Sequence, residues 1–282
     1  MQKIWLILKP LIKQFNLPDL YSRTAEMAFY LTVSIFPSMI FIICALAYIP
    51  DVNLIKIQTS LAQLIPNEAF IIVQTLITSA VSNRSLHLLF FSFMLATWTF
   101  SKAVKSMIKG QNMAFGFKET RSFIKLNIFC IVYAVGFFIV TLLCVAFLVY
   151  GNKLSFLFRK AVGDFFILNL LYNLMRYLIP IAVMIYIFIN LFTLGPCGNL
   201  KFKQAIPGAI TTTLLWLIFS LIYSFYANYF FQSKEIYGSI SSIIILLTWL
   251  YLCGMAITIG YKLNAIIYHQ EAARRRSNSR VN

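Results

Sequence analysis

Acidic residues and histidines are few in this sequence. Its 282 residues include 8 Asp and Glu and 2 His. The two histidines, His87 and His269, are far apart, and the carboxylates are scattered along the chain. Neither a His-rich metal motif nor a G-x-x-x-x-G-K-S/T phosphate loop occurs. Because hydrolytic catalysis needs a metal ion or an acid–base pair, we expect no enzyme activity, no metal and no cofactor.

The cysteines also lack an informative spacing. There are 5 of them, none in a C-x-x-C pair, and four lie inside apolar runs, where a thiol behaves as a small hydrophobic group. The sequence therefore predicts neither a disulfide framework nor a structural metal site.

Apolar residues, in contrast, are abundant. The chain is 60% hydrophobic and 11% charged, and its mean hydropathy is +0.81, which is more apolar surface than one soluble core can hide. A membrane-spanning helix needs about 20 apolar residues, because the hydrocarbon layer is roughly 30 Å thick. Six charge-free runs reach or approach this length: Met27–Pro50, Leu86–Ser101, Leu126–Asn152, Tyr177–Leu200, Gln204–Ser233 and Ile236–Tyr261. We predict an all-α polytopic membrane protein with six transmembrane helices.

The positive side chains indicate the orientation. With six spans, both termini lie on one side of the membrane, and most of the 24 Lys and Arg residues would lie on that side. Basic loops stay in the cytoplasm, so both termini are predicted to be cytoplasmic. The 151–176 connection, with four basic residues on the other side, weakens the bias. This distribution accounts for the net charge of +16 without nucleic acid as a partner.

Three further segments are amphipathic. Apolar and basic side chains separate onto two faces in residues 1–16, which predicts a helix lying in the membrane interface. Residues 54–83, in two pieces divided by Pro66, are predicted to form a helical cap outside the first two spans, and residues 154–174 are predicted to be interfacial. A packed extramembrane helix is the alternative for each. The predicted organisation is a six-helix membrane domain over 1–265 and a basic cytoplasmic tail over 266–282.

The first span contains a proline and follows an ion pair. Pro37 removes one backbone hydrogen bond, so a kink is expected. Pro37 is either an ordinary membrane proline or a hinge beside a cavity. Glu26 lies three residues after Arg23 and is predicted to form an interfacial ion pair with it. A proton-coupling role would require Glu26 to reach the membrane interior.

The fifth and sixth spans carry polar and aromatic side chains. Pro207 is predicted to lie in the first turn of the fifth span, where a proline is tolerated. Further along that span, a polar stripe of residues recurs at steps of seven, four and four, formed by Thr213, Ser220, Ser224 and Asn228. This polar stripe either joins helices or lines a hydrated path. Trp249 and Tyr251 fall near the middle of the last span, and their N–H and O–H groups need hydrogen-bond partners inside the bundle. The predicted lining of a transport route comprises Pro37, Thr213, Ser220, Ser224, Asn228, Trp249 and Tyr251.

Several motifs carry a family resemblance. They are Ala28–Leu31, Ser34–Pro37, Ile206–Ala209, Tyr237–Ser239 and Trp249–Tyr251. With them, the chain resembles the YihY/BrkB family of six-helix bacterial inner-membrane proteins, once mislabelled as ribonuclease BN. The resemblance implies a bacterial cytoplasmic (inner) membrane location. It also implies structural roles for Pro207, Gly208, Tyr237, Gly238, Gly260 and Asn264.

The chain departs from the family at one position. Where the family reads Gly-Ala-Glu-Leu-Asn, this chain reads Gly260-Tyr261-Lys262-Leu263-Asn264. Loss of the acidic residue puts any mechanism built on it in doubt here.

Two functions fit these patterns. Charges are scarce in the spans, which disfavours an ion-coupled carrier and favours an amphipathic cargo such as a lipid or lipid-linked envelope precursor. The alternative is a scaffold that binds envelope-assembly proteins and transports nothing. A lipid-filled groove would favour the first function, and a dry core would favour the second. Membrane lipids are the predicted partners, and the sequence sets no oligomeric state.

Overall fold

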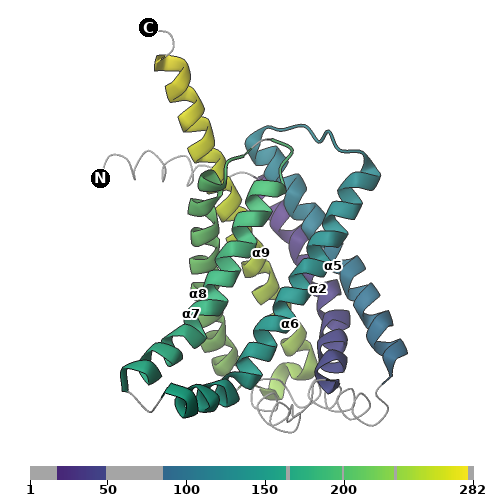
Figure 1. Cartoon of the computed structure of the whole chain (residues 1–282). Helices are drawn as coiled ribbons and strands as arrows, with labels where there is room; N and C mark the ends of the chain where they lie inside the picture. The colour runs from purple at the N-terminus through teal and green to yellow at the C-terminus, as the bar shows by residue number, and fades with distance from the viewer. Residues whose placement is uncertain (1–17, 49–84, 163–165, 199, 232–233, 279–282) are drawn as a thin grey trace.

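The computed structural model describes residues 18–48, 85–162, 166–198, 200–231 and 234–278, and all regular structure in this part of the chain is helical. The helices are α2 (Pro18–Ala47), α5 (Leu86–Phe115), α6 (Phe123–Val162), α7 (Phe166–Leu194), α8 (Phe202–Phe231) and α9 (Lys234–Asn278) (Figure 1). The helices correspond in order to the six predicted spans.

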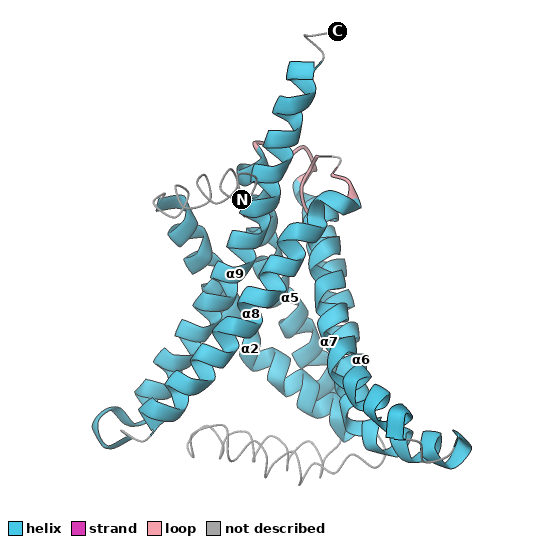
Figure 2. Cartoon of the chain, turned by 90° about the vertical axis from the view of Figure 1, so that its left-hand side faces the viewer, coloured by secondary structure: helices cyan, strands magenta, loops and turns pink. Residues whose placement is uncertain are grey.

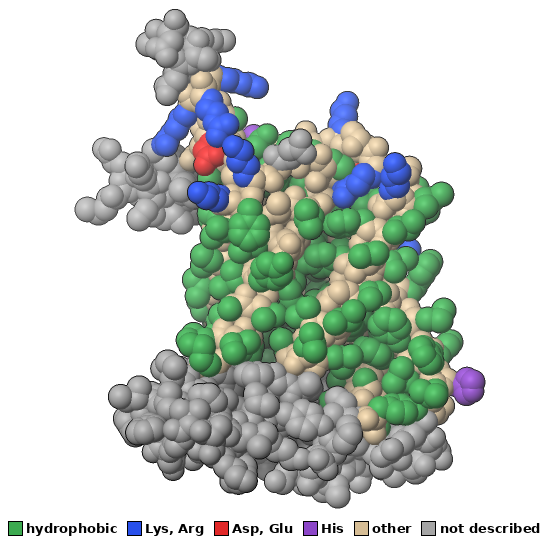
Figure 3. Space-filling view, in the orientation of Figure 1, with side chains coloured by type: hydrophobic (Ala, Val, Ile, Leu, Met, Phe, Trp, Pro, Cys, Tyr) green, Lys and Arg blue, Asp and Glu red, His purple; other side chains and the backbone are tan. Residues whose placement is uncertain are grey.

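Within the described residues, four helices are long and apolar enough to cross a membrane. Their apolar stretches are Leu20–Ala47, Phe123–Cys144, Phe202–Tyr223 and Leu246–Arg276. α7 contributes a shorter stretch, Leu178–Leu194. Apolar side chains cover the flank of the bundle, while Lys and Arg gather at the end where α9 projects (Figure 3). The predicted all-α polytopic membrane protein is confirmed.

The helices converge at one end of the bundle and splay apart at the other (Figure 2). We call the converging end the basic end, because the Lys and Arg side chains gather there. α2 packs along α5, and α8 packs along α9, which also contacts α2 and α5. α6 lies against α5 and α7 against α8, whereas α6 and α7 share only a small contact. The closest packing therefore involves α2, α5, α8 and α9.

The structure corrects one predicted segment. Residues 154–174 are not a separate helix, because α6 continues to Val162 and α7 begins at Phe166. No proline interrupts the sequence from Phe123 to Val162, so the helical hydrogen bonds continue beyond the predicted span. The predicted amphipathic helices at 1–16 and 54–83 lie outside the described residues. α9 passes residue 265 without a break, and the division into domain and tail stays a prediction.

Local signals set both ends of α5. The Ser85 side chain accepts a hydrogen bond from the Leu88 N–H at 3.2 Å, which caps the first turn. At the other end, Gly116 adopts φ 72°, a left-handed conformation that glycine tolerates. Its N–H bonds to the carbonyls of Asn112 and Met113. This turn directs the 117–122 loop across the basic end.

The main buried core lies between α5 and its neighbours. It includes Val104 and Ile108 of α5, Phe192 of α7, Ala209 of α8 and Tyr261 of α9. Side chains from all six described helices meet in this cluster, which fixes α5 and α9 relative to each other.

Candidate functional site

Two glycines allow α8 and α9 to touch through their backbones. A Cβ atom on Gly260 would collide with Thr212 Oγ1 and would lie 2.7 Å from the Gly208 carbonyl oxygen. A Cβ atom on Gly208 would collide with the Gly260 carbonyl and the Asn264 amide. Small residues at a helix crossing permit this close approach in membrane proteins. We call Gly208, Thr212, Gly260 and Asn264 the α8–α9 seam.

Asn264 completes this seam with two hydrogen bonds. Its Oδ1 accepts from the Gly208 N–H at 2.7 Å, and its Nδ2 donates to the Ala205 carbonyl at 3.2 Å. The side chain is buried, with 1% exposure. α8 begins at Phe202, so the prediction that Pro207 lies in the first helical turn is wrong. Because Pro207 sits deeper in the helix and has no N–H, it interrupts the backbone ladder there, and Asn264 bonds to the neighbouring groups.

A second crossing joins α2 to α9. Thr24 Oγ1 donates to the Leu20 carbonyl at 2.8 Å and lies 3.3 Å from Thr258 Oγ1. The Thr258 hydroxyl donates to the Gly254 carbonyl at 2.9 Å. A Cβ on Gly254 would come within 3.2 Å of the Thr24 carbonyl oxygen. The centre of the bundle is therefore closely packed at both crossings.

A polar cluster ties two loops together at the basic end. Arg121 makes a two-pronged contact with the Glu119 carboxylate, at 2.8 and 3.0 Å, and donates to the Gly195 carbonyl at 2.7 Å. Asn112 accepts from the Cys197 N–H at 2.9 Å and donates to Glu119 at 2.9 Å. We call these residues the loop clamp. Hydrogen bonds from Arg121 lower the pKa of Glu119 to about 2, and the same pairing raises the pKa of Arg121.

The loop clamp predicts a pH-dependent stability. The pKa of Glu119 falls from 4.5 to about 2 on folding. The stabilisation of the folded state by its carboxylate is therefore present above about pH 4.5 and is lost as the pH falls towards 2. We expect Glu119→Gln to lower the free energy of unfolding at pH 7 by less than about 1 kcal/mol, because the pair is partly exposed. The measurement is thermal unfolding in detergent at pH 7 and pH 3, with the exposed Lys118→Gln as the control. A stability gap of equal size at both pH values would contradict the prediction.

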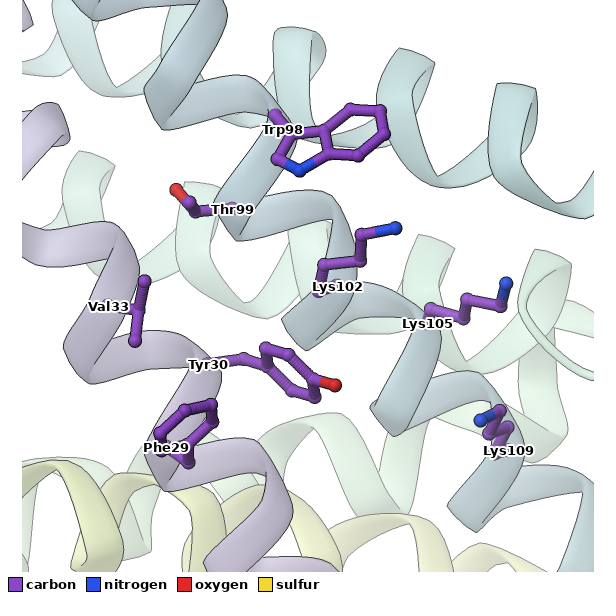
Figure 4. Close-up of a pocket in the computed structure, with 8 residues that line it drawn as sticks. All are labelled: Phe29, Tyr30, Val33, Trp98, Thr99, Lys102, Lys105 and Lys109. Carbon is purple, nitrogen blue, oxygen red and sulfur yellow. The ribbon is translucent and has the colours of Figure 1, made fainter.

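A lateral pocket of about 410 Å³ lies between α2 and α5. Its lining residues are Phe29, Tyr30, Val33, Trp98, Thr99, Lys102, Lys105 and Lys109 (Figure 4). We call it the α2–α5 pocket. Phe29 is 63% exposed and Trp98 57% exposed, so the apolar wall faces the outside of the bundle. The pocket therefore opens to the side, where a lipid would lie.

The lysines of the pocket project from one face of α5. Their spacing of three and four residues places them on successive turns. Lys102 Nζ lies 4.3 Å from the centre of the Trp98 ring. Lys105 Nζ lies 4.3 Å from the centre of the Phe123 ring and donates to Asn127 Oδ1 at 2.9 Å. Aromatic rings and an amide thus hold two of the three ammonium groups in place.

The predicted route residues do not meet at this pocket. Pro37 is buried in α2, which continues through it, and α2 and α8 scarcely touch. Thr213 is buried and its hydroxyl donates to the Ala209 carbonyl of its own helix at 2.9 Å. The Ser220 hydroxyl is buried with no hydrogen-bond partner in the described structure. None of these residues lines the α2–α5 pocket.

The aromatic residues of the last span pack between helices. Trp249 lies 6.3 Å from Trp216 and 5.9 Å from Tyr223, measured between ring centroids, so α8 and α9 share an aromatic cluster. Tyr251 is half-buried on α9. Several predicted side chains lie outside the described part of the structure: those of Ser224, Asn228, Tyr237 and Gly238. The lining of a route by these residues stays a prediction.

Arg23 and Glu26 form an ion pair. Arg23 Nη1 lies 2.7 Å from Glu26 Oε2, and both side chains are 30% exposed. Arg23 also contacts the Met113 sulfur at 3.1 Å, near the end of α5. Glu26 is therefore engaged at the basic end of the bundle rather than in its interior.

Sequence reasoning missed the α2–α5 pocket and the loop clamp. The charge-free run that predicts the second span ends at Ser101, so Lys102, Lys105 and Lys109 lie outside the predicted span. α5 instead continues to Phe115, which puts all three on the helix. Their helical spacing was the available signal. No comparable signal pairs Glu119 with Cys197, because the loops that carry them meet only in the folded bundle.

A protein family and one relative match this chain over most of its length, and other relatives match part of it. The family described as virulence factor BrkB matches residues 11–282. The putative ribonuclease-like protein YfkH of Bacillus subtilis is 28% identical over 264 residues, which cover 94% of this chain and 96% of that protein. A UPF0761 membrane protein of Pseudoalteromonas translucida is 34% identical over 90 residues, covering 32% of this chain and 30% of that protein. No solved structure matches the chain significantly.

Proposed function

Because this chain belongs to the BrkB family of membrane proteins, we propose that it is an inner-membrane protein that takes up an amphipathic lipid or lipid-linked envelope component and translocates it. The observation that carries this proposal is the α2–α5 pocket. It combines an exposed aromatic wall with three ammonium groups and opens sideways from the bundle. A pocket of this kind suits a molecule that has both an acyl chain and a polar headgroup.

The distribution of basic residues supports an orientation. Lys and Arg gather at the end of the bundle that holds the loop clamp and the projecting end of α9 (Figure 3). By the positive-inside rule, this end faces the cytoplasm, and both termini lie there. The α2–α5 pocket then takes its lipid from the cytoplasmic leaflet of the membrane.

A second candidate function is a scaffold for envelope-assembly proteins. The observation that favours it is the close packing at the α8–α9 seam and at the crossing of α2 with α9. A rigid bundle of this kind can present its loops to partners without transporting anything. The two functions differ in whether lipid movement depends on the protein.

We also propose that the protein is not a ribonuclease, although one relative carries a ribonuclease-like name. Among the described residues, no three His, Cys, Asp or Glu side chains come together. His87 is exposed near the start of α5, and His269 is exposed near the end of α9. No acid–base pair of the kind used in RNA cleavage is formed by these two residues.

The translocation proposal predicts faster lipid movement in reconstituted vesicles. We expect a fluorescent phospholipid to cross the bilayer faster with the protein than without it. Thr99→Trp should slow this movement towards the protein-free rate, because the larger side chain fills the α2–α5 pocket. The matched control is Ile139→Trp, which places the same side chain on an exposed face of α6. Equal rates with and without the wild-type protein would refute translocation and leave the scaffold.

A further inference from the structure

We propose that the α2–α5 pocket recognises the phosphate headgroup of an anionic phospholipid through Lys102, Lys105 and Lys109. This inference rests on the proposed function and adds the chemical class of the lipid. The three residues line one pocket from one helix face (Figure 4). The direct observation is therefore a concentration of positive charge beside an exposed apolar wall.

No described carboxylate neutralises the positive charge of the pocket. The described structure has two ion pairs, and neither involves a lysine of the pocket. The carboxylates with described side chains are engaged elsewhere: Glu26 with Arg23, Glu119 with Arg121 and Glu271 with Gln204. Lys105 also experiences the charges of Lys102 and Lys109, which repel it. A bound anion would relieve this repulsion in a partly desolvated site.

The order of residues along α5 matches the shape of a lipid. Trp98 lies farthest from the basic end and Lys109 nearest to it, and the three lysines extend over about 10 Å of the helix axis. On α2, Phe29 and Val33 continue the apolar wall, and Tyr30 extends towards the lysines (Figure 4). A headgroup near the lysines would therefore place its acyl chains against Trp98 and Val33. This arrangement favours a lipid over a free phosphate ion, because a phosphate ion has no apolar part that could contact the wall.

Electrostatics selects between classes of phospholipid. A phosphatidylcholine headgroup brings its own ammonium, which the lysines would repel. An anionic headgroup, above all a phosphomonoester with up to two negative charges, meets three donors and no competing cation. Each basic side chain near an anionic lipid surface strengthens binding roughly fivefold. Three lysines therefore predict a preference for phosphatidic acid over phosphatidylcholine of at least about tenfold, after allowance for their mutual repulsion.

Trp98 provides a reporter inside the pocket. We would replace the other tryptophans (Trp5→Phe, Trp216→Phe and Trp249→Phe) in the full chain and measure quenching of Trp98 by dibrominated phosphatidic acid in phosphatidylcholine vesicles. Quenching by dibrominated phosphatidylcholine gives the reference. We expect preferential quenching by phosphatidic acid, and loss of the preference in Lys102→Gln/Lys105→Gln/Lys109→Gln. The corresponding triple arginine variant should retain it, because the charge remains.

Matched controls separate the pocket from the net charge. Lys118→Gln/Lys201→Gln/Lys203→Gln removes the same charge from exposed positions outside the α2–α5 pocket and should leave the preference unchanged. Inorganic phosphate at millimolar concentration should not abolish the preference. If the single-tryptophan protein fails to fold, photoreactive phosphatidic acid on the wild-type chain gives the same comparison through cross-links to peptides of α2 and α5.

Each result has a distinct meaning. Equal quenching by both lipids overturns headgroup recognition and leaves lipid translocation standing if vesicles still show it. Equal loss in both triple glutamine variants assigns the preference to overall charge and overturns the pocket. Abolition by inorganic phosphate identifies a general phosphate site and overturns the commitment to lipid. Headgroup recognition in a protein that moves no lipid would refute translocation alone.

Discussion

Gly260→Ala is expected to destabilise the protein by about 3 kcal/mol, which is near the upper end for overpacking a core. The added Cβ would collide with Thr212 Oγ1 and press on the Gly208 carbonyl, and one of these contacts is with backbone. Backbone cannot rotate away as a flexible side chain can, so α8 and α9 must separate along the α8–α9 seam. The melting temperature in detergent should fall by roughly 6–12 °C, as followed by fluorescence-detected unfolding.

Gly136→Ala is the matched control for this substitution. It introduces the same methyl group on α6, where a Cβ atom meets nothing within 4 Å. Alanine also favours a helix over glycine by about 1 kcal/mol, so this variant should be as stable as the wild type or slightly more stable. A Gly260→Ala protein that melts together with Gly136→Ala would show that the seam is looser than the structure indicates.

Asn264→Leu is expected to lower the free energy of unfolding by about 2 kcal/mol, because it removes two buried hydrogen bonds between α8 and α9 that contribute roughly 1 kcal/mol each. The substitution keeps a side chain of similar size but removes the bonds to the Gly208 N–H and the Ala205 carbonyl. Both groups lie beside Pro207, where the helix ladder is already interrupted. Thermal unfolding of the purified protein is again the measurement.

Asn190→Leu separates this effect from the general loss of an asparagine. The Asn190 side chain donates to the Tyr186 carbonyl of its own helix at 2.8 Å, and this bond is exposed. Its removal should change the melting temperature by far less than Asn264→Leu. A similar loss in both variants would mean that Asn264 does not hold the two helices together.

The number and order of the long helices follow from composition alone. Runs of apolar residues have no stable place in water, and a helix is the only open-chain structure that satisfies its own backbone within lipid. The ends of the helices were harder to predict. α5 continues past its charge-free run to Phe115, and α6 continues to Val162, because lysine and arginine are good helix formers. α5 ends where Gly116 adopts a left-handed conformation.

The residues of the α8–α9 seam were partly identified from the sequence, whereas the α2–α5 pocket was not. The resemblance singled out Gly208, Gly260 and Asn264, but their contact with one another depends on how α8 crosses α9. The lysines of α5 fall outside the predicted second span, because a span defined by a charge-free run ends at the first charged residue. The polar stripe of α8 was visible in the sequence, yet its described members, Thr213 and Ser220, do not reach the α2–α5 pocket.

The sequence by itself determined that this protein is a helical membrane protein with a strongly basic character, because hydropathy and charge are properties of the residues whatever their neighbours. Only the tertiary structure decided which side chains meet. It brought Asn264 to Gly208, Arg121 to Gly195, and Phe29 of α2 into one pocket with Lys102 of α5. These contacts depend on helix crossings and on loops distant in the chain, and the spacing of residues along one helix does not encode them.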